Sequence, residues 1–447
     1  MQKACRIVCE TYDKSNGEVI ARDELLNVNI AKPKIIDEIG LDYETQLRLV
    51  RSSIDKVIEL QGPLINEYSH CPKCNTPIRK NGKKECMVHS MNLDHKIEIQ
   101  KYRCHKCDWM SPNSIRGIYG TDVHTSLTKV QAELGSNYSF RKVASILEQL
   151  SGNQKRDINN QVRIKRVVTQ VGAAIEEYNK LAPTKSITPS QALIVHVDGA
   201  HVSTTEKDKR SFEAMTATIF RPEDVKATDN NKSVIIQKTC IASAKSDDQA
   251  SMKEMLLNGA IRHGMTKGTE ITGLSDGASN CKSVIRYLEP HCNKLEVILD
   301  WFHIAMKFQN MMSNDLLSDQ QEDLEGAKWK LWHGLKHDCF DKLKRVMDNI
   351  TDTKLKKRAQ QLLQYLQNNE DILVNYEERS NKKLPFSSNV AESTVENLVN
   401  SRYRQSGKMQ WTREGAHSLL QIRAASYSKL LHKMWDYVFS SILKVAI

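Results

Sequence analysis

Two short cysteine pairs constrain the fold of this chain more than any other feature of its sequence. The four residues are Cys71, Cys74, Cys104 and Cys107, and 29 residues separate the second from the third. Four thiolates on two tight turns can close tetrahedrally on Zn²⁺. A module of this size buries too little apolar surface to fold alone, so the metal would supply its folding free energy. The pattern predicts a structural zinc ribbon over residues 66–120, with Cys86 and His89 as possible substitute ligands.

The sequence between the two cysteine pairs is typical of a β-hairpin. Asn81-Gly82 predicts a turn, and the alternating segments Glu85–Met91 and His95–Tyr102 predict strands. Zinc ribbons bind nucleic acid, bind protein or serve as rigid spacers, so the hairpin alone does not identify a target. Unrelated free cysteines are the alternative interpretation of the four residues.

The positive charge of the chain is concentrated in one block. The formal net charge is +11, and residues 66–190 contain 20 Lys and Arg against 11 Asp and Glu, whereas residues 1–65 contain 9 against 11. A basic block of this kind predicts binding to a polyanion such as nucleic acid.

The composition indicates a folded protein of several domains. A length of 447 residues predicts about two to four domains, and 40% hydrophobic with 27% charged residues excludes a disordered or fibrous chain. The first thirty residues are charged throughout, and no apolar stretch approaches the roughly 18 residues of a membrane span. We therefore expect a soluble cytoplasmic protein without membrane contact, whose 11 cysteines are thiols or metal ligands.

Residues 121–182 predict a helix-turn-helix DNA-binding region, because two apolar helical faces flank a predicted turn at Ser151-Gly152. The basic residues of these helices that are available for phosphates or base edges are Arg141, Lys142, Arg163, Lys165 and Arg166. A solvated helical pair without DNA contacts is the alternative. Residues 183–190, which contain Pro, Ser and Thr, predict a linker.

Residues 191–302 alternate short apolar strands with helices. The predicted strands are Ala192–Val197, Ala214–Phe220, Val234–Ala242, Glu270–Leu274 and Leu295–Leu299, and the predicted helices are Asp247–His263 and Ala278–Leu288. The resulting order β-β-β-α-β-α-β is that of the ribonuclease H-like fold. The predicted fold class is therefore α/β, with a ribonuclease H-like core.

Two aspartates stand where predicted strands stop. Asp198 follows the first strand, Asp276 follows the fourth, and each precedes a glycine that lets the backbone turn sharply. In this topology the two strand ends are adjacent, so both carboxylates would project into one cleft. Such carboxylates can hold two Mg²⁺ ions about 3.5–4 Å apart, which suits cleavage of a phosphodiester. Asp-Gly is also a common turn dipeptide, which is the alternative for either residue.

The remaining segments are assigned by composition and capping pattern. Residues 303–385 are charged, rich in Leu, Lys and Gln and poor in Gly and Pro, which predicts an all-helical insertion. Residues 386–447 are predicted to complete the core, with Glu392 in the first turn of a helix as a third carboxylate. Residues 1–65 predict an N-terminal helical segment of unknown role.

Together these motifs resemble those of DDE transposases from bacterial insertion sequences, in the branch related to Mutator-like elements, over roughly residues 66–430. The segments Asp198–Ala200, Ser275–Ala278 and Asn389–Ser393 resemble those that carry the first Asp, the second Asp and the final Glu. Downstream, Arg402–Trp411 resembles the Arg-x-x-x-x-Gly-x-x-Trp segment of the family, and Asp300–His303 resembles its Asp-x-Phe-His element.

The resemblance implies a transposase whose catalytic residues Asp198, Asp276 and Glu392 bind two Mg²⁺ or Mn²⁺ ions. They would hydrolyse a phosphodiester at each transposon end, after which the freed 3′-hydroxyl attacks target DNA. The implied partners are double-stranded DNA, as terminal inverted repeats and target, and further copies of the chain in a homodimer or higher oligomer on DNA, in a bacterial cytoplasm. The DNA contacts that the resemblance adds are Arg402, Arg404 and Trp411.

Several assignments stay open at this point. Asp300 is an alternative to Asp276 as the second catalytic Asp, and Glu396, one helical turn beyond Glu392, is an alternative final Glu. His303 is expected to order the cleft or the insertion rather than to bind a catalytic metal.

Trp411 either stacks on a DNA base or belongs to the core. Two other functions are compatible with the same motifs: a non-catalytic DNA-binding regulator descended from a transposase, and a structure-selective nuclease. The regulator is disfavoured because Asp or Glu fills all three carboxylate positions.

Overall fold

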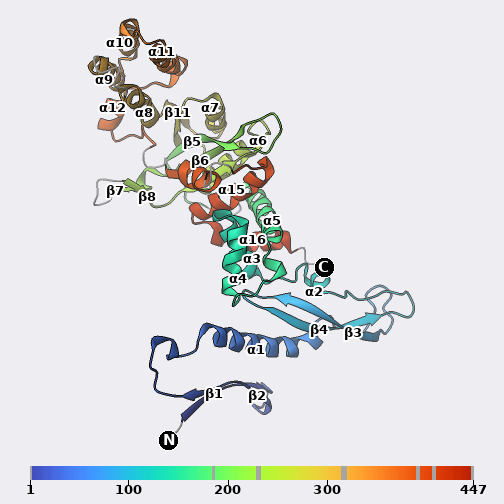
Figure 1. Cartoon of the computed structure of the whole chain (residues 1–447). Coiled ribbons are helices and arrows are strands. Elements are labelled where there is room, and N and C mark those ends of the chain that lie inside the picture. The colour runs from blue at the N-terminus through green and yellow to red at the C-terminus, as the bar shows by residue number, and fades with distance from the viewer. Residues whose placement is uncertain are drawn as a thin grey trace. The chain divides into compact units, whose positions relative to one another are not determined.

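The computed structural model describes residues 3–183, 187–227, 233–313, 320–388, 393–404 and 409–443. The chain divides into two compact units, one of Met1–Gln170 with Asp436–Ile447 and one of Val171–Trp435. Figure 1 shows the elements of each unit, coloured along the chain. In the described part of the chain, no helix has the length and apolar character that a bilayer crossing requires.

The first unit begins with an antiparallel hairpin of β1 (Lys3–Tyr12) and β2 (Val19–Ile30), followed by α1 (Tyr43–Gln61). The prediction of a helical segment over residues 1–65 is therefore wrong for residues 3–30. Two register shifts in the hairpin interrupt the alternation by which a strand is recognised in sequence. Helix α1 begins at a capping residue, Asp42, whose carboxylate accepts the N–H of Thr45.

The second hairpin joins the two cysteine pairs. It consists of β3 (Arg79–His89) and β4 (Asp94–Arg103), and a small apolar cluster that includes Ile58 of α1 and Ile99 of β4 covers it. The predicted turn at Asn81-Gly82 is wrong, because both residues lie within β3. They stand opposite one residue of β4 as a bulge, which the positive φ of Gly82 (73°) accommodates. The hairpin turns instead at residues 90–93.

Four helices follow in this part of the chain: α2 (Ile115–Tyr119), α3 (Thr125–Asn137), α4 (Phe140–Leu150) and α5 (Gln161–Lys180). Buried Leu127, Val143 and Ile164 pack α3, α4 and the start of α5 together. The connection from α4 to α5 spans residues 151–160 and contains a 3₁₀ turn, so it is longer than the three- to four-residue turn of a helix-turn-helix. The predicted helices and the predicted turn at Ser151-Gly152 are present, but the connection continues beyond that turn to residue 160.

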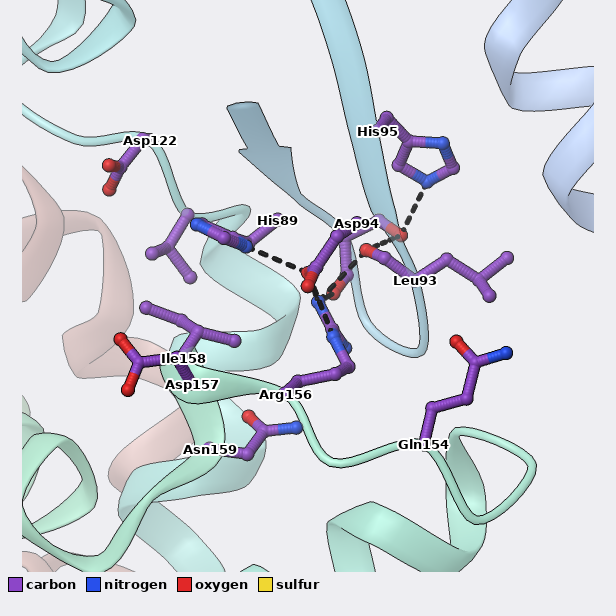
Figure 2. A network of polar contacts seen from close by, with 12 residues as sticks. His89, Leu93, Asp94, His95, Asp122, Gln154, Arg156, Asp157, Ile158 and Asn159 are labelled. Carbon is purple, nitrogen blue, oxygen red and sulfur yellow. Dashed lines mark hydrogen bonds and ion pairs between the residues drawn. The ribbon is translucent and has the colours of Figure 1, made fainter. Parts of the chain in front are cut away.

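Arg156 fixes the turn of the second hairpin to the α4–α5 connection (Figure 2). Its side chain is 3% exposed and donates to Oδ1 of Asp94 from Nε at 2.8 Å and from Nη2 at 2.5 Å. The same guanidinium donates to the carbonyl oxygens of Ser90, Met91 and Leu93. Nδ1 of His89 lies 2.7 Å from Oδ1 of Asp94. Burial tends to raise the pKa of Asp94, but the bonds from Arg156 and His89 outweigh it and lower that pKa.

The second unit contains a five-stranded mixed sheet in the order β11-β10-β5-β6-β9. The strands are β5 (Ala192–Ser203), β6 (Ser211–Phe220), β9 (Thr239–Ser243), β10 (Glu270–Ser275) and β11 (Lys294–Leu299), with helices α6 (Ala250–Arg262) and α7 (Ser279–Arg286) between them. β5, β10 and β11 are parallel, whereas β6 is antiparallel to both of its neighbours. The predicted α/β class is confirmed. The prediction of one strand over Val234–Ala242 is wrong, because this segment contains two strands. β8 (Ser233–Ile235) pairs with β7 (Val225–Ala227) in a separate short sheet, and only β9 joins the five-stranded sheet.

The two faces of this sheet have different coverings. Leu193, Val195 and Val197 of β5 point into a core that α6 and α7 complete. The alternate residues of β5 face the other way, where Ile194 packs with Leu274 and Ile298 of the neighbouring strands. The polar side chains described below share this second face.

A helical segment follows β11, as the composition predicts. Its helices are α8 (Trp301–Met312), α9 (Gln321–Trp332), α10 (Lys336–Asn349), α11 (Thr353–Asn368) and α12 (Tyr376–Asn381). They enclose a continuous apolar core that includes Leu299, the last residue of β11. The hydroxyl of Tyr376 also donates to the carbonyl oxygen of Leu299, at 2.8 Å. These contacts fix the helical segment against the edge strand.

The end of the second unit returns to the sheet. Short helical turns, α13 (Ser393–Val395), a π-helix (Glu396–Asn400) and α14 (Ser401–Tyr403), precede α15 (Arg413–Tyr427) and α16 (Leu431–Ile442). Buried Gln421 of α15 donates to the carbonyl oxygen of Ala242 in β9, which places α15 beside that strand.

Candidate functional site

Three aspartates occupy one register row of the parallel strands. Val197 of β5 pairs with Ser275 of β10, which pairs with Leu299 of β11. The next residues along the three strands are Asp198, Asp276 and Asp300. Strand β5 does not stop at Val197 as predicted, because pairing with β6 carries it on to Ser203. Pairing between β5 and β10 ends at Val197, so Asp198 is the first residue of β5 beyond that pairing.

Asp198 is largely buried. Its Oδ1 accepts the N–H of Gly199 at 2.7 Å. Burial raises the pKa of Asp198 above its usual value, the nearby His196 and His303 imidazoles oppose this shift, and the negative charge of Asp276 adds to it.

Asp276 lies on a sharp turn at the mouth of the same region. Its Oδ1 accepts the N–H of Ala278 at 2.9 Å, and its carbonyl oxygen accepts the hydroxyl of Tyr365 at 2.8 Å. Gly277 has a φ of 92°, and a Cβ there would lie 2.6 Å from Nδ2 of Asn369. The turn therefore requires glycine for both its backbone conformation and its closeness to α11.

Asp300 differs from the other two aspartates because it is fully buried and saturated with donors. It is 0% exposed, and its Oδ1 accepts the N–H of Phe302 at 3.1 Å and the N–H of Ser388 at 2.8 Å. The Ser388 hydroxyl donates to Oδ2. Asp300 therefore caps α8 and ties residue 388 to the sheet.

Two imidazoles complete the cluster around Asp198. Nε2 of His303 lies 3.9 Å from Oδ2 of Asp198 and 3.6 Å from Oδ2 of Asp300. His196, Asp198 and His303 each offer a ligand atom within 4.8 Å of the others, which is compatible with a metal ion. Nε2 of His196 is buried and has no hydrogen-bond partner among the described residues. The sequence analysis missed His196, although a histidine within an apolar strand is its signal.

Glu213 of β6 is a further carboxylate that the sequence analysis missed. Its Oε2 accepts the amide of Asn280 in α7 at 2.5 Å. Its Oε1 faces Gly199, where an added Cβ would collide with it. Burial, reinforced by the charges of Asp276, Asp198 and Glu213, raises the pKa of the Cys281 thiol. Glu213 thus extends the acidic region to the opposite face of β5.

The predicted third carboxylate, Glu392, lies outside the described residues, as do Asn389, Val390 and Ala391. The alternative, Glu396, opens the π-helix, and its carboxylate accepts the amide of Asn400 at 2.9 Å. This hydrogen bond of Glu396 is local to its own turn.

The segment around Trp411 extends the sheet. The N–H of Trp411 donates to the carbonyl oxygen of Ser203, and the indole ring lies 4.8 Å from the ring of Tyr403. Arg402 is predicted to contact DNA. Its side chain is 1% exposed and lies over the Trp411 ring, so it packs in the core among the described residues of the second unit. Arg404 is exposed and donates to the carbonyl oxygen of His201 at 3.4 Å.

The predicted DNA contacts of the first unit lie on α4 and α5. Arg141 and Lys142 are exposed near the start of α4, and Nε of Arg141 donates to Gln161 at the start of α5. Lys165 and Arg166 are also exposed. Arg163 is half-buried and forms an ion pair with Asp157. A groove of about 680 Å³ lies between α4 and the start of α5, and Arg141 and Lys155 are among its lining residues.

The four predicted zinc ligands are brought together. Sγ of Cys71 lies 3.6 Å from that of Cys107, Sγ of Cys74 lies 3.5 Å from that of Cys104, and all four sulfurs lie within 4.8 Å of one another. Zn–S bonds of about 2.3 Å in a tetrahedron place the sulfurs about 3.8 Å apart. The cluster is compatible with structural zinc.

The two cysteine turns share one backbone geometry. The N–H of Cys71 donates to the carbonyl oxygen of Thr76, and the N–H of Cys104 donates to that of Trp109. The residues after the second cysteine of each pair, Asn75 and Asp108, have φ values of 56° and 54°. Asn and Asp tolerate this left-handed conformation better than other non-glycine residues, which explains their place in the two turns.

Comparison with known proteins gives a family and several structural likenesses. A family model described as "Uncharacterised protein family (UPF0236)" matches residues 121–436. No curated protein matches the chain. Among solved structures, the chain is similar to the "Drosophila P element transposase strand transfer complex", with a TM-score of 0.30 and 8% sequence identity over 69% of this chain and 93% of that chain. At that TM-score the likeness carries no functional argument. The family match spans more than half of the sequence, and the protein therefore belongs to the uncharacterised protein family UPF0236.

Proposed function

We propose that this protein is a transposase that cuts and joins DNA phosphodiester bonds with a metal-binding carboxylate site. The observation that carries the proposal is that Asp198 and Asp276 directly follow Val197 and Ser275, the last pair between the adjacent parallel strands β5 and β10. Carboxylates placed in this way can share divalent cations, and phosphoryl transfer depends mainly on positioning and charge neutralisation.

The topology of the sheet supports the same proposal. Numbered along the chain, its strands lie in the order 3-2-1-4-5, with the second strand antiparallel and the last two parallel to the first. We propose that this arrangement is a ribonuclease H-like core, with the catalytic carboxylates Asp198 on the first strand and Asp276 directly after the fourth. The helical segment of residues 303–385 is the proposed insertion, and Glu392, in the C-terminal part of the core, is the proposed third carboxylate.

The residues present fit a divalent cation. Asp198 offers a hard oxygen ligand, and the unpartnered, buried Nε2 of His196 and the nearby Nε2 of His303 offer nitrogen. We propose Asp276, which lies outside that cluster, as a further oxygen ligand. An all-oxygen site suits Mg²⁺, whereas a site that recruits imidazole favours Mn²⁺. When bound, the ions would activate a water or a 3′-hydroxyl and stabilise the leaving oxygen.

The remaining side chains would hold this constellation in place. Asp300 fixes the end of β11 and the start of α8, from which His303 projects toward Asp198. Tyr365 holds the backbone of Asp276 through its carbonyl oxygen. We therefore assign Asp276 rather than Asp300 as the second ligand-bearing Asp, because the donors around Asp300 already satisfy its buried carboxylate.

The first unit would bind the DNA ends. Its basic block contains the cysteine cluster, which we propose is a zinc ribbon, and the exposed cations of α4 and α5, including Arg141 and Lys165. Binding through phosphate contacts would weaken steeply as salt is raised. Transposition joins two ends to one target, so we propose a dimer or larger assembly on DNA.

The test is incubation of the full-length protein with DNA that carries the inverted repeats flanking its coding region, in Mg²⁺ or Mn²⁺. We expect cut ends that are joined to a second DNA, and we expect Glu392→Gln to abolish both products. Pre-nicked ends separate the candidate functions. A transposase joins them, a nuclease cuts without joining, and a regulator binds the repeats without changing them. Binding without cleavage would overturn the proposal.

A further inference from the structure

A groove of about 660 Å³ opens beside Asp276, between the carboxylate end of the sheet and α11 of the helical segment. Its walls include Lys282 of α7 and Lys307 of α8. The opposite wall is the face of α11 that carries Gln361, Gln364 and Asn368. A hollow of this volume is in the range of about 300–1,000 Å³ typical of ligand pockets, so it admits part of one nucleic-acid strand but not a duplex.

Helix α11 has the composition of a helix that faces a polyanion. From Lys354 to Asn369 it carries four Lys or Arg and six Asn or Gln, without a single Asp or Glu. Its leucines, such as Leu362 and Leu366, are buried in the core of the helical segment. The exposed amides of Gln361, Gln364 and Asn368 recur at helical spacing, so they form one polar face of α11. This face lines the groove.

Contacts across the groove hold its walls in a defined position. Nζ of Lys282 donates to Oδ1 of Asn369 at 3.0 Å, and Nζ of Lys307 lies 4.2 Å from the centre of the Tyr365 ring. Tyr365 in turn donates to the carbonyl oxygen of Asp276. Helix α11 is therefore linked directly to the backbone of the proposed catalytic aspartate through Tyr365.

The exposed amides also form a pair. Nε2 of Gln364 donates to Oδ1 of Asn368 at 2.7 Å, which aligns the two side chains on the groove wall. Side-chain amides offer a donor and an acceptor together, which is the pattern that base edges and sugars require. The ammonium groups of Lys282 and Lys307 match phosphates.

From these observations we infer that the groove binds one unpaired DNA strand next to the scissile phosphodiester, with Gln361, Gln364 and Asn368 on the bases or sugars and the lysines on the backbone. The inference rests on the proposed function, because it names the part of the DNA substrate that the site would hold. An acidic peptide fits less well, since side-chain carboxylates do not use a row of amides.

Photocrosslinking tests the contact without requiring catalysis. Benzoylphenylalanine is placed at position 364 or, as a matched control, at position 360, an exposed glutamine of α11 that does not line the groove. Each full-length protein is irradiated with terminal-repeat DNA that has an unpaired strand at the end, with Ca²⁺ in place of Mg²⁺. We expect a crosslink to the unpaired strand from position 364 that exceeds the one from position 360 by about tenfold. Equal yields from protein that is bound to the DNA would overturn the inference.

Substitution provides the second readout. Gln361→Ala with Gln364→Ala should lower the affinity for the unpaired strand about tenfold, because two hydrogen-bonding side chains are lost, whereas Gln360→Ala with Gln367→Ala should leave it unchanged. Fluorescence anisotropy of a labelled strand measures both. If the Gln361→Ala, Gln364→Ala variant binds the strand as tightly as the Gln360→Ala, Gln367→Ala control, the groove does not bind the strand. If the Gln361→Ala, Gln364→Ala variant loses affinity as expected but the wild-type protein cuts no DNA, the proposed function is wrong and the strand-binding site is still supported.

Discussion

Asp198 and Asp276 occupy the same register row of two neighbouring parallel strands, one residue beyond the pair formed by Val197 and Ser275. The row continues to Asp300 on β11, but the three carboxylates are not equivalent. Asp198 and Asp276 remain partly exposed, whereas Asp300 is completely enclosed by donors. This difference in exposure leaves Asp198 and Asp276 accessible to a cation, as proposed above, whereas Asp300 has a structural role.

Asp300→Asn should destabilise the second unit, whereas Asp276→Asn should not. Asparagine would keep an acceptor for the N–H groups of Phe302 and Ser388, but an NH₂ group would replace Oδ2, which accepts the Ser388 hydroxyl. The loss of this buried hydrogen bond to a charged group should cost about 1–3 kcal/mol. Asp276 is partly exposed, and its substitution removes a negative charge near Asp198. Chemical denaturation of both variants measures the free energies of unfolding. Equal losses would show that Asp300 has no special structural role.

Zinc should co-purify with the protein at one ion per chain and depend on the cysteine cluster. Cys104→Ser should release the metal and unfold residues 66–120, because the hairpin has few buried apolar residues to replace it. Cys292→Ser, at a half-buried cysteine of the second unit, is the control and should retain zinc. Elemental analysis with circular dichroism measures both effects. A wild-type chain that folds without zinc would count against the assignment.

Arg156→Ala should loosen the turn of the second hairpin from the α4–α5 connection. It removes a guanidinium that is 3% exposed and leaves Asp94 without its main partner, at a cost of about 3 kcal/mol. Arg103→Ala breaks an exposed ion pair with Asp108 and should cost less than about 1 kcal/mol. Amide hydrogen exchange over residues 86–100 reports the difference. Equal protection in the two variants would contradict the role of Arg156.

The same network should make the first unit sensitive to acid. The pKa of Asp94 is lower in the folded chain than its usual value, so its contribution to stability is complete above about pH 4 and is lost as the pH falls through the folded pKa. The groups that face it are the guanidinium of Arg156 and the imidazole of His89. Thermal denaturation at decreasing pH should show a steeper loss for wild type than for Asp94→Asn. An equal loss of thermal stability with falling pH in wild type and Asp94→Asn would contradict this prediction.

Patterns that depend on local spacing were predictable from the sequence. The cysteine pairs, the strand and helix order of residues 191–302, and the adjacency of Asp198 and Asp276 follow from short motifs and from the topology that they imply. The strand boundary at Asp198 was not predictable, because β5 continues only through pairing with β6. Pairing partners are a tertiary property that alternation in one strand does not contain.

Other features depend on contacts between distant residues. The burial of Arg402 against Trp411 and the saturation of Asp300 by Ser388 arise from segments that return to the sheet after long intervals. The role of His196 was hidden because its neighbours are apolar core residues. The hairpin of residues 3–30 was missed because its register shifts break the period of two.

Metal-dependent cleavage of terminal-repeat DNA by wild type, Asp198→Asn and Asp276→Asn tests the central claim most directly. The control is Glu270→Gln, which changes an exposed carboxylate at the other end of β10. We predict that wild type and Glu270→Gln cut the DNA in Mg²⁺ or Mn²⁺, and that each aspartate variant binds the DNA with unchanged affinity but cuts it at least a thousandfold more slowly, roughly the loss of one essential electrostatic group. Cleavage at the wild-type rate by either aspartate variant would contradict the account.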